Sequence, residues 1–221
     1  MGRARFTALP PVSQHTLVGA LPGPDLAAAG YTVGEYTAAG TATGRTPDGP
    51  AEPAGFATRL LVRRPAEAAA FNGTVVVEWL NVSSGNDAAP EYTYLADELV
   101  RSGYAWAGVS AQYAGVHGGG GSVDVGLEAN GLVGSKPDRY GSLRHPGDAY
   151  CYDLFGAVGA ALADPADDSD HPLAGLPVTQ ILAVGESQSA MAMTTYVNRF
   201  AAGHGVFDGY LIHSRARSEL P

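Results

Sequence analysis

The stretch AVGESQSAM, residues 183–191, decides the fold of this chain. It continues the apolar run VTQILAVG (178–185), which has the length and composition of a buried strand, and a helical pattern begins at Gln188. The stretch is close to Gly-x-Ser-x-Gly, the sharp strand-to-helix turn that presents a catalytic serine, with Ser189 in place of the second glycine. Ser187 is therefore a candidate nucleophile.

The residues around Ser187 are small enough for such a turn. The residues two before and two after the serine must be small, because the strained backbone brings strand and helix close together. Gly185 meets this requirement, and Ser189 adds only a Cβ and a hydroxyl that can hydrogen-bond backwards within the helix. From these residues alone, a plain strand-to-helix turn with a capping serine remains the alternative.

The order of the apolar segments predicts an α/β fold in a single domain over residues 1–221. The expected strands cover residues 73–81, 104–112, 178–185 and 206–214, and the expected helices begin near Pro90, Pro146 and Gln188. Strands that are apolar on both faces and separated by helices are typical of a parallel sheet with right-handed crossovers. Residues 29–42 and 55–65 are expected to form an antiparallel start to the sheet, preceded by an irregular segment over 1–28.

Composition excludes several classes of protein. A chain of 221 residues with 45% apolar and 16% charged residues can bury a substantial core. The net charge of −9 disfavours nucleic-acid and anionic-membrane partners, which require clustered Lys and Arg. The single Cys151 excludes an internal disulfide, and neither it nor the six His show metal-ligand spacing. We therefore expect no metal and no cofactor.

The sequence also bears on location. No apolar run approaches the roughly 18–20 residues that span a bilayer. Arg3 and Arg5 lie where a secretory signal has its basic residues, but Pro10-Pro11, Gln14 and His15 interrupt the stretch that follows. We expect a soluble, cytoplasmic protein.

An oxyanion hole is expected beside Ser187. One donor is the backbone N–H of Gln188, at the positive end of the helix that it opens. The second is expected in the loop NVSSGND (81–87), where Val82 or Ser83 is the candidate. Ser83-Ser84-Gly85 could equally form an ordinary turn.

The run HGGGG (117–121) is a second glycine-rich stretch. It resembles the oxyanion motif of esterases, but that motif follows the strand two before the nucleophile strand. The run HGGGG instead follows the strand immediately before the nucleophile strand. We interpret it as part of a long flexible loop and as a candidate rim over the site.

Four segments together resemble the bacterial alpha/beta hydrolase domain family proteins: GTVVVEWLNVSSGNDAAPEY, YAWAGVSAQYAGV, RYGSLRHPGDAYCYDLF and ILAVGESQSA. The resemblance runs from about residue 29 to the C-terminus, and family members carry the same Gly-Glu-Ser-Gln-Ser turn. It implies an α/β-hydrolase fold, a mostly parallel sheet with helices on both faces, and Ser187 as the nucleophile. The expected partner is a small-molecule carboxylic ester, cleaved through an acyl-Ser187 intermediate.

The end of the sequence departs from the family pattern. In this fold the acid and the histidine of the triad follow the serine, and family members continue well beyond Pro221. We therefore expect a sheet without its last strands, self-association through the exposed edge, and little or no esterase activity from this chain alone. A non-catalytic binding or pseudo-enzyme domain of the same fold is the alternative.

Several ionisable residues are candidates for the missing base. His213 lies at the end of an expected strand, where open α/β sheets bind ligands, and is the first candidate. His145, ahead of Asp148, is the second, although each histidine could simply satisfy backbone groups. Glu78, inside a buried strand, is expected to pair with an arginine. Glu186 could point into the site or cap the helix.

Overall fold

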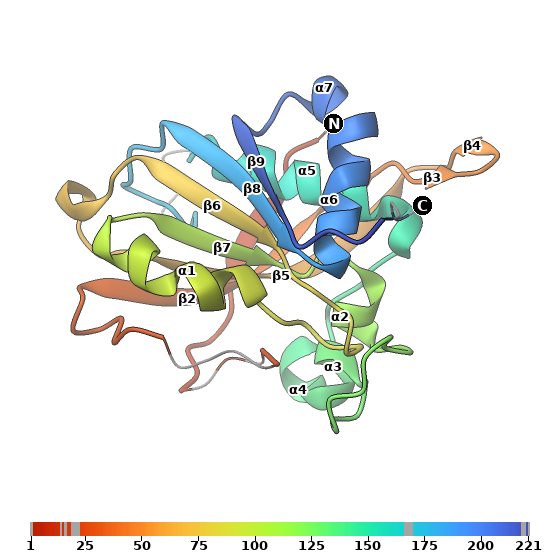
Figure 1. Ribbon diagram of the computed structural model, residues 1–221, viewed down its shortest axis with the longest axis horizontal. Helices are drawn as coiled ribbons and strands as arrows, with labels where there is room; N and C mark the ends of the chain where they lie inside the picture. Colours follow the sequence, from red (N-terminus) through yellow and green to blue (C-terminus); the bar gives the residue numbers. More distant parts are fainter. Residues whose placement is uncertain are drawn as a thin grey trace.

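The computed structural model describes residues 2–13, 15, 17–18, 23–165, 170–217 and 220. These residues form a seven-stranded sheet in the order β1-β2-β5-β7-β6-β8-β9 (Figure 1). Its strands are β1 (Arg5–Ala8), β2 (Tyr31–Ala42), β5 (Ala54–Pro65), β6 (Thr74–Trp79), β7 (Ala105–Val109), β8 (Gln180–Glu186) and β9 (Gly209–His213). A separate hairpin, β3 (Arg45–Thr46) and β4 (Gly49–Pro50), projects from the body.

The sheet is mixed, with a parallel half that carries the site. Strands β7, β6, β8 and β9 are parallel, whereas β1, β2 and β5 pair in antiparallel order and β5 runs antiparallel to β7. The antiparallel start and the parallel remainder are both as predicted. The structure differs from the irregular segment expected over 1–28 at Arg5–Ala8, which pairs with β2 as the edge strand β1. Four residues are too few to show a strand pattern in sequence.

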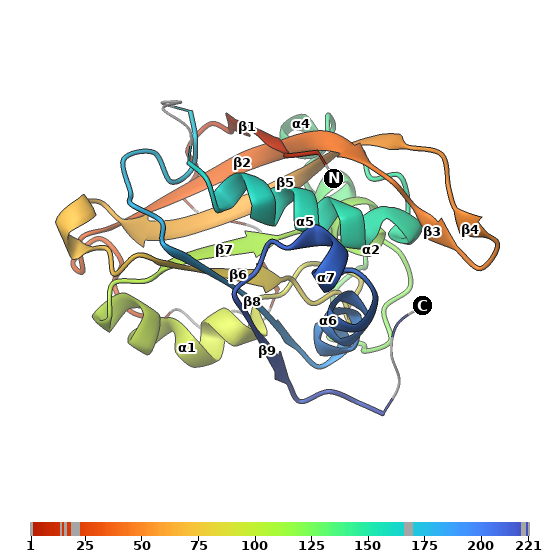
Figure 2. The ribbon, with the colours of Figure 1, turned by 90° about the horizontal axis from the view of Figure 1, so that it is seen from above.

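The helices lie on both faces of the sheet. Their bounds, with two short 3-10 turns, are η1 (Ala68–Ala70), α1 (Pro90–Arg101), α2 (Tyr113–His117), α3 (Gly131–Ser135), α4 (Pro137–Tyr140), η2 (Asp148–Tyr150), α5 (Cys151–Leu162), α6 (Gln188–Arg199) and α7 (Ala201–His204). Helix α1 covers one face, and α5 lies over the other (Figure 2). Within the described residues, none of these helices combines the length and apolarity needed to cross a bilayer.

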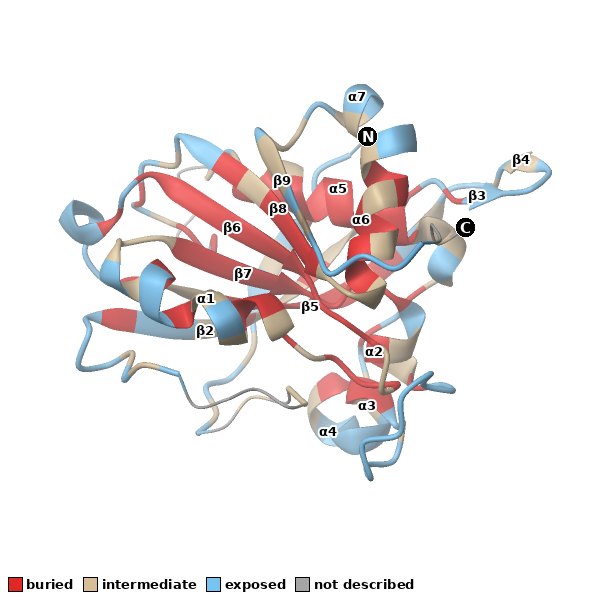
Figure 3. Cartoon of the chain, viewed as in Figure 1, coloured by how far each residue is buried: buried red, intermediate tan, exposed pale blue. Residues whose placement is uncertain are grey.

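Burial explains why the central strands read as continuous apolar runs. Every residue of β6 and β7 is buried (Figure 3). On one face Trp79 packs against Phe155 of α5, with ring centroids 4.9 Å apart. On the other face Trp106 packs against Tyr92 of α1, with ring centroids 4.8 Å apart. Both faces of these strands must therefore be apolar, and no alternation of polar and apolar residues appears.

Strand β9 forms one edge of the sheet, with β8 as its neighbour. Leu211 in its middle is 44% exposed. An unprotected edge with an exposed apolar side chain can pair with a second copy of the chain. We expect the average mass in light scattering to rise with protein concentration and Leu211→Lys to reduce this rise, whereas Val33→Lys on β2 leaves it unchanged. A monomer at every concentration contradicts the expected self-association.

Candidate active site

Ser187 occupies the turn between β8 and α6. Strand β8 ends at Glu186 and α6 begins at Gln188, and Ser187 between them has φ 57° and ψ −112°. A non-glycine residue in this region is strained by about 1–3 kcal/mol, and such strain clusters at functional sites. The predicted strand–turn–helix arrangement around Ser187 is confirmed, and its role as a nucleophile stays a prediction.

The neighbouring strands hold this turn. The N–H of Ser187 donates to the carbonyl oxygen of His213 on β9, at 3.0 Å. On the other side, the side-chain amide of Asn81 donates to the carbonyl oxygen of Glu186, at 2.9 Å. The strained backbone is therefore fixed by hydrogen bonds from both adjacent segments of the sheet.

Small residues make the turn possible. A Cβ on Gly185 would lie 2.9 Å from the carbonyl oxygen of Ser189, closer than real Cβ contacts come. Ser189 itself is fully buried, and its hydroxyl donates to the Glu186 carbonyl oxygen at 2.8 Å and accepts from the Glu186 N–H at 3.0 Å. The hydroxyl bonds back to the end of the strand, so a serine is accommodated where the usual motif has glycine.

The loop 81–87 lies against the turn, but its candidate oxyanion donors already have partners. The N–H of Val82 donates to the side-chain oxygen of Gln188 at 3.3 Å. The N–H of Ser83 donates to the side-chain oxygen of Asn81 at 2.8 Å. The Gln188 amide in turn donates to Gln112 at 2.7 Å. Convergence of the Gln188 and Val82 or Ser83 N–H groups on a substrate oxygen therefore stays a prediction that requires these side chains to move.

Buried charges anchor the far end of this loop. The carboxylate of Asp87 accepts from the guanidinium of Arg59 at 2.7 Å and from the hydroxyl of Ser110. Arg59 is fully buried in β5 and also lies 3.4 Å from Glu35. Sequence reasoning missed this pair because its members lie on separate elements and neither shows a local motif.

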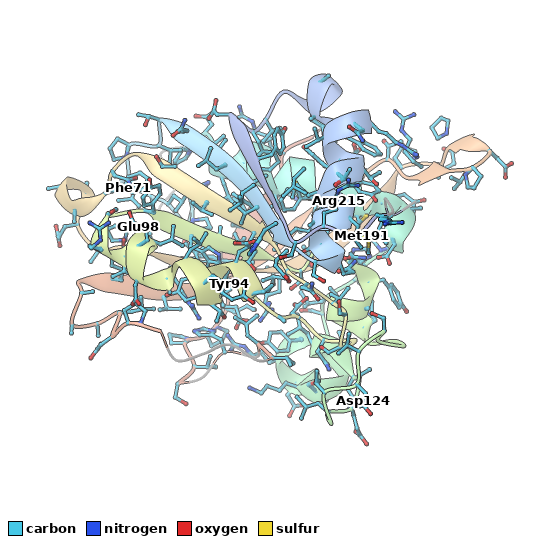
Figure 4. The ribbon with its side chains drawn as sticks, viewed as in Figure 1. Phe71, Tyr94, Glu98, Asp124, Met191 and Arg215 are labelled. Atoms are coloured by element: carbon cyan, nitrogen blue, oxygen red, sulfur yellow. The ribbon has the colours of Figure 1, made fainter. Side chains whose placement is uncertain are left out.

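His213 lies against a buried carboxylate, a partner that sequence reasoning also missed. Its Nδ1 lies 2.8 Å from the carboxylate of Glu91, in the first turn of α1. The Glu91 side chain is 2% exposed and that of His213 is 45% exposed. Tyr94, on the outer side of α1, lies edge-on to the His213 ring at 5.7 Å between centroids (Figure 4). In the part of the chain that the structure describes, no residue binds Nε2 of His213.

The second candidate, His145, has a structural role. It is buried, its Nε2 lies 2.9 Å from the carbonyl oxygen of Ala111, and its Nδ1 accepts from the N–H of Gly147 at 3.2 Å. Burial lowers the pKa of this imidazole. With both ring nitrogens engaged in backbone hydrogen bonds, His145 has no free nitrogen with which to act as a base.

Glu78 holds the start of α1. Its carboxylate accepts from the backbone N–H groups of Glu91 at 3.0 Å and Tyr92 at 2.9 Å, and from the indole N–H of Trp106 at 2.9 Å. The expected arginine partner is wrong for the described residues, among which no ion pair includes Glu78. Arg63 instead stacks over the ring of Tyr92, 3.8 Å from its centroid. Glu78 therefore fixes the position of Glu91.

A cavity of about 280 Å³ opens beside Ser187. It is lined by Ser187 together with Glu186, Asn81 and Ser83. Burial raises the pKa of Glu186, and the neighbouring His213 opposes the shift. The structure therefore brings Ser187, Glu186 and the loop after β6 to one cavity.

The buried carboxyl of Glu78 makes a pH-dependent contribution to stability. Burial raises its pKa from 4.5 to about 8, although the N–H groups of Trp106, Tyr92 and Glu91 oppose the shift. Because the folded-state pKa is raised, its stabilisation is fully present below about pH 4.5 and is lost as the pH rises to about 8. We expect the free energy of unfolding from urea titrations to fall between pH 5 and pH 8.5 by up to a few kcal/mol more in the wild type than in Glu78→Gln.

Glu98→Gln serves as the control, because Glu98 is an exposed residue of α1, the helix whose first N–H groups Glu78 accepts (Figure 4). It should leave the slope of stability against pH at its wild-type value over this range. Equal slopes for the wild type and Glu78→Gln would show that the Glu78 carboxyl does not titrate between the two pH values.

Solved esterase structures show distant similarity to this chain. A brefeldin A esterase, a bacterial homologue of human hormone-sensitive lipase, is 16% identical with a TM-score of 0.41 over 88% of this chain and 42% of that one. A glucuronoyl esterase from Teredinibacter turnerae is 14% identical with a TM-score of 0.40, over 98% of this chain and 47% of that one. An acetyl xylan esterase from Paenibacillus is 15% identical with a TM-score of 0.37, over 96% of this chain and 54% of that one.

The chain thus spans about half the length of these structures. None of the curated protein sequences matches it significantly. The family model described as alpha/beta hydrolase domain, in contrast, matches residues 6–221. This match covers the sheet from β2 to β9 and confirms the resemblance drawn from the sequence. The chain belongs to the alpha/beta hydrolase domain family.

Proposed function

We propose that this chain is a serine hydrolase that acts on a carboxylic ester through an acyl-Ser187 intermediate. One observation carries the proposal: Ser187, with its φ of 57°, lies at the turn between β8 and α6 and lines a cavity. A strained serine at a sharp strand-to-helix turn is how α/β hydrolases expose a nucleophile. Membership of an alpha/beta hydrolase family supports the same chemistry.

His213 is the proposed base. Its Nδ1 faces the buried carboxylate of Glu91 at 2.8 Å, which favours the tautomer with a proton on Nδ1 and a lone pair on Nε2. The hydrogen bond from the Ser187 N–H to the His213 carbonyl oxygen makes the two residues direct neighbours. A serine needs such a neighbouring base to become a useful nucleophile at neutral pH.

In the proposed reaction, the hydroxyl oxygen of Ser187 adds to the ester carbonyl carbon and its proton passes to Nε2 of His213. The backbone N–H of Gln188 stabilises the oxyanion, joined by the N–H of Val82 once the Gln188 side-chain oxygen leaves it. Collapse expels the alcohol, which takes the proton from His213. Water then adds to the acyl-Ser187 ester and passes a proton to Nε2 of His213, and collapse returns this proton to the Ser187 oxygen and releases the carboxylic acid.

One observation favours a second candidate function, a non-catalytic binding domain of the same fold. The N–H groups of Val82 and Ser83 both donate to side-chain oxygens, at 3.3 Å and 2.8 Å, so that of the three candidate donors the Gln188 N–H alone is left for an oxyanion. A single donor is a weaker site, since removing one donor typically costs about 10²–10³-fold in kcat. The cavity would then bind an ester without cleaving it.

Turnover of p-nitrophenyl acetate separates the two functions. We expect slow release of p-nitrophenol by the purified chain, abolished in Ser187→Ala. His213→Asn should lower the rate by roughly 10²-fold or more, the contribution typical of a positioned general base. A rate in Ser187→Ala equal to that of the wild type contradicts the hydrolase and leaves the binding domain.

His204→Asn is the matched control for the histidine. His204 also faces a carboxylate, that of Asp153 at 2.8 Å, and it binds the hydroxyl of Tyr196 at 3.0 Å. It lies in α7, beyond the end of α6 that is remote from Ser187 (Figure 1). Its substitution should leave ester turnover unchanged, so that an equal loss in both variants would indicate a general effect on folding.

A further inference from the structure

The glycine-rich loop between α2 and α3, residues 118–130, is seated on the loop after β6. The N–H of Val123 donates to the carbonyl oxygen of Ser83 at 2.9 Å. A Cβ on Gly121 would lie 2.6 Å from the carbonyl carbon of Ser84 and 2.7 Å from the Ser83 oxygen. Glycine is thus required for this close backbone approach. The flexibility expected from the sequence stays a prediction, and Gly121 has in addition a role in this contact that the sequence does not show.

This contact places two valines at the mouth of the cavity. Val123 and Val125 both line the cavity beside Ser187, although both side chains are exposed. Asp124 between them lies at the outer tip of the loop (Figure 4), where its carboxylate accepts from the N–H of Gly126 at 2.8 Å. The loop therefore contributes Val123 and Val125 to the cavity, whereas Asp124 lies at its outer tip.

The rest of the cavity is small, largely apolar and nearly uncharged. Its other apolar walls come from Val18 and from Ala88, Ala89 and Pro90 at the start of α1. Glu186 is the one ionisable residue that lines it in the described part of the chain. The volume of about 280 Å³ lies just below the range of about 300–1,000 Å³ that holds drug-sized ligands.

These features point to the substrate class of the hydrolase proposed above, on which this inference rests. We propose that the cavity takes the short, uncharged acyl chain of a small ester and that Val123 and Val125 limit its length. Apolar walls exclude water from a short alkyl chain. A carboxylate on that chain would enter a cavity whose one ionisable lining residue in the described chain, Glu186, is acidic, with no lysine, arginine or histidine in the lining to balance it.

A series of p-nitrophenyl esters tests the chain length. For the wild type we expect kcat/KM to fall by roughly tenfold or more from butyrate to octanoate, a discrimination within the reach of a pocket that rejects extra methylenes. Val123→Ala with Val125→Ala should remove most of this fall. Gly121→Val should also remove most of the fall, because its side chain displaces the backbone of the loop from Ser83 and Ser84. Leu127 is an exposed apolar residue of the same loop, and Leu127→Ala should leave the fall in kcat/KM from butyrate to octanoate unchanged.

Binding to Ser187→Ala separates this inference from the proposed hydrolase. Ligand-detected NMR should show methyl butyrate bound to Ser187→Ala, methyl octanoate bound at least several-fold more weakly, and no binding of either after the further change Val123→Trp. Equal binding of both esters, or binding unaffected by Val123→Trp, overturns the assignment of the cavity. Selective binding of the short ester by a chain that cleaves no ester would instead refute the hydrolase and keep the cavity assignment.

Discussion

The backbone conformation of Ser187 is the constraint on which the candidate site depends. A non-glycine residue with φ 57° persists only where its surroundings compensate the strain. Here they do so from two sides, through the His213 carbonyl oxygen on β9 and the Asn81 side chain after β6. Both contacts require β6, β8 and β9 to be parallel and in register, with Glu186 opposite His213. The parallel half of the sheet thus creates the turn.

Buried polar groups extend this control to the loop and helix beside Ser187. The loop 81–87 is fixed at its far end by the pair of Asp87 and Arg59, and α1 begins where Glu78 accepts its first N–H groups. Removing one member of a buried ion pair typically costs about 3–5 kcal/mol, because the other charge is left without a partner. Helix α1 in turn places the Glu91 carboxylate within hydrogen-bond distance of His213. The interior of the sheet therefore determines where the groups around Ser187 lie.

The fold and the Ser187 turn could be predicted because their signals are local. A buried parallel strand is a continuous apolar run, and the small residues around Ser187 follow it directly in sequence. The pair of Glu91 and His213 joins residues 122 positions apart, and a glutamate in the first helical turn is already explained by the helix dipole. Nothing in the sequence marks a partner for Gly121, so its contact with Ser83 and Ser84 could come only from the fold.

The central claim is that Ser187 is an activated nucleophile, and covalent labelling tests it most directly. The chain would be treated with a small fluorophosphonate, and its intact mass and peptide masses then measured. The account predicts one adduct per chain, on the peptide that contains Ser187, and no adduct after Ser187→Ala. A folded chain that takes up no label, or that carries it on a different residue, contradicts the account.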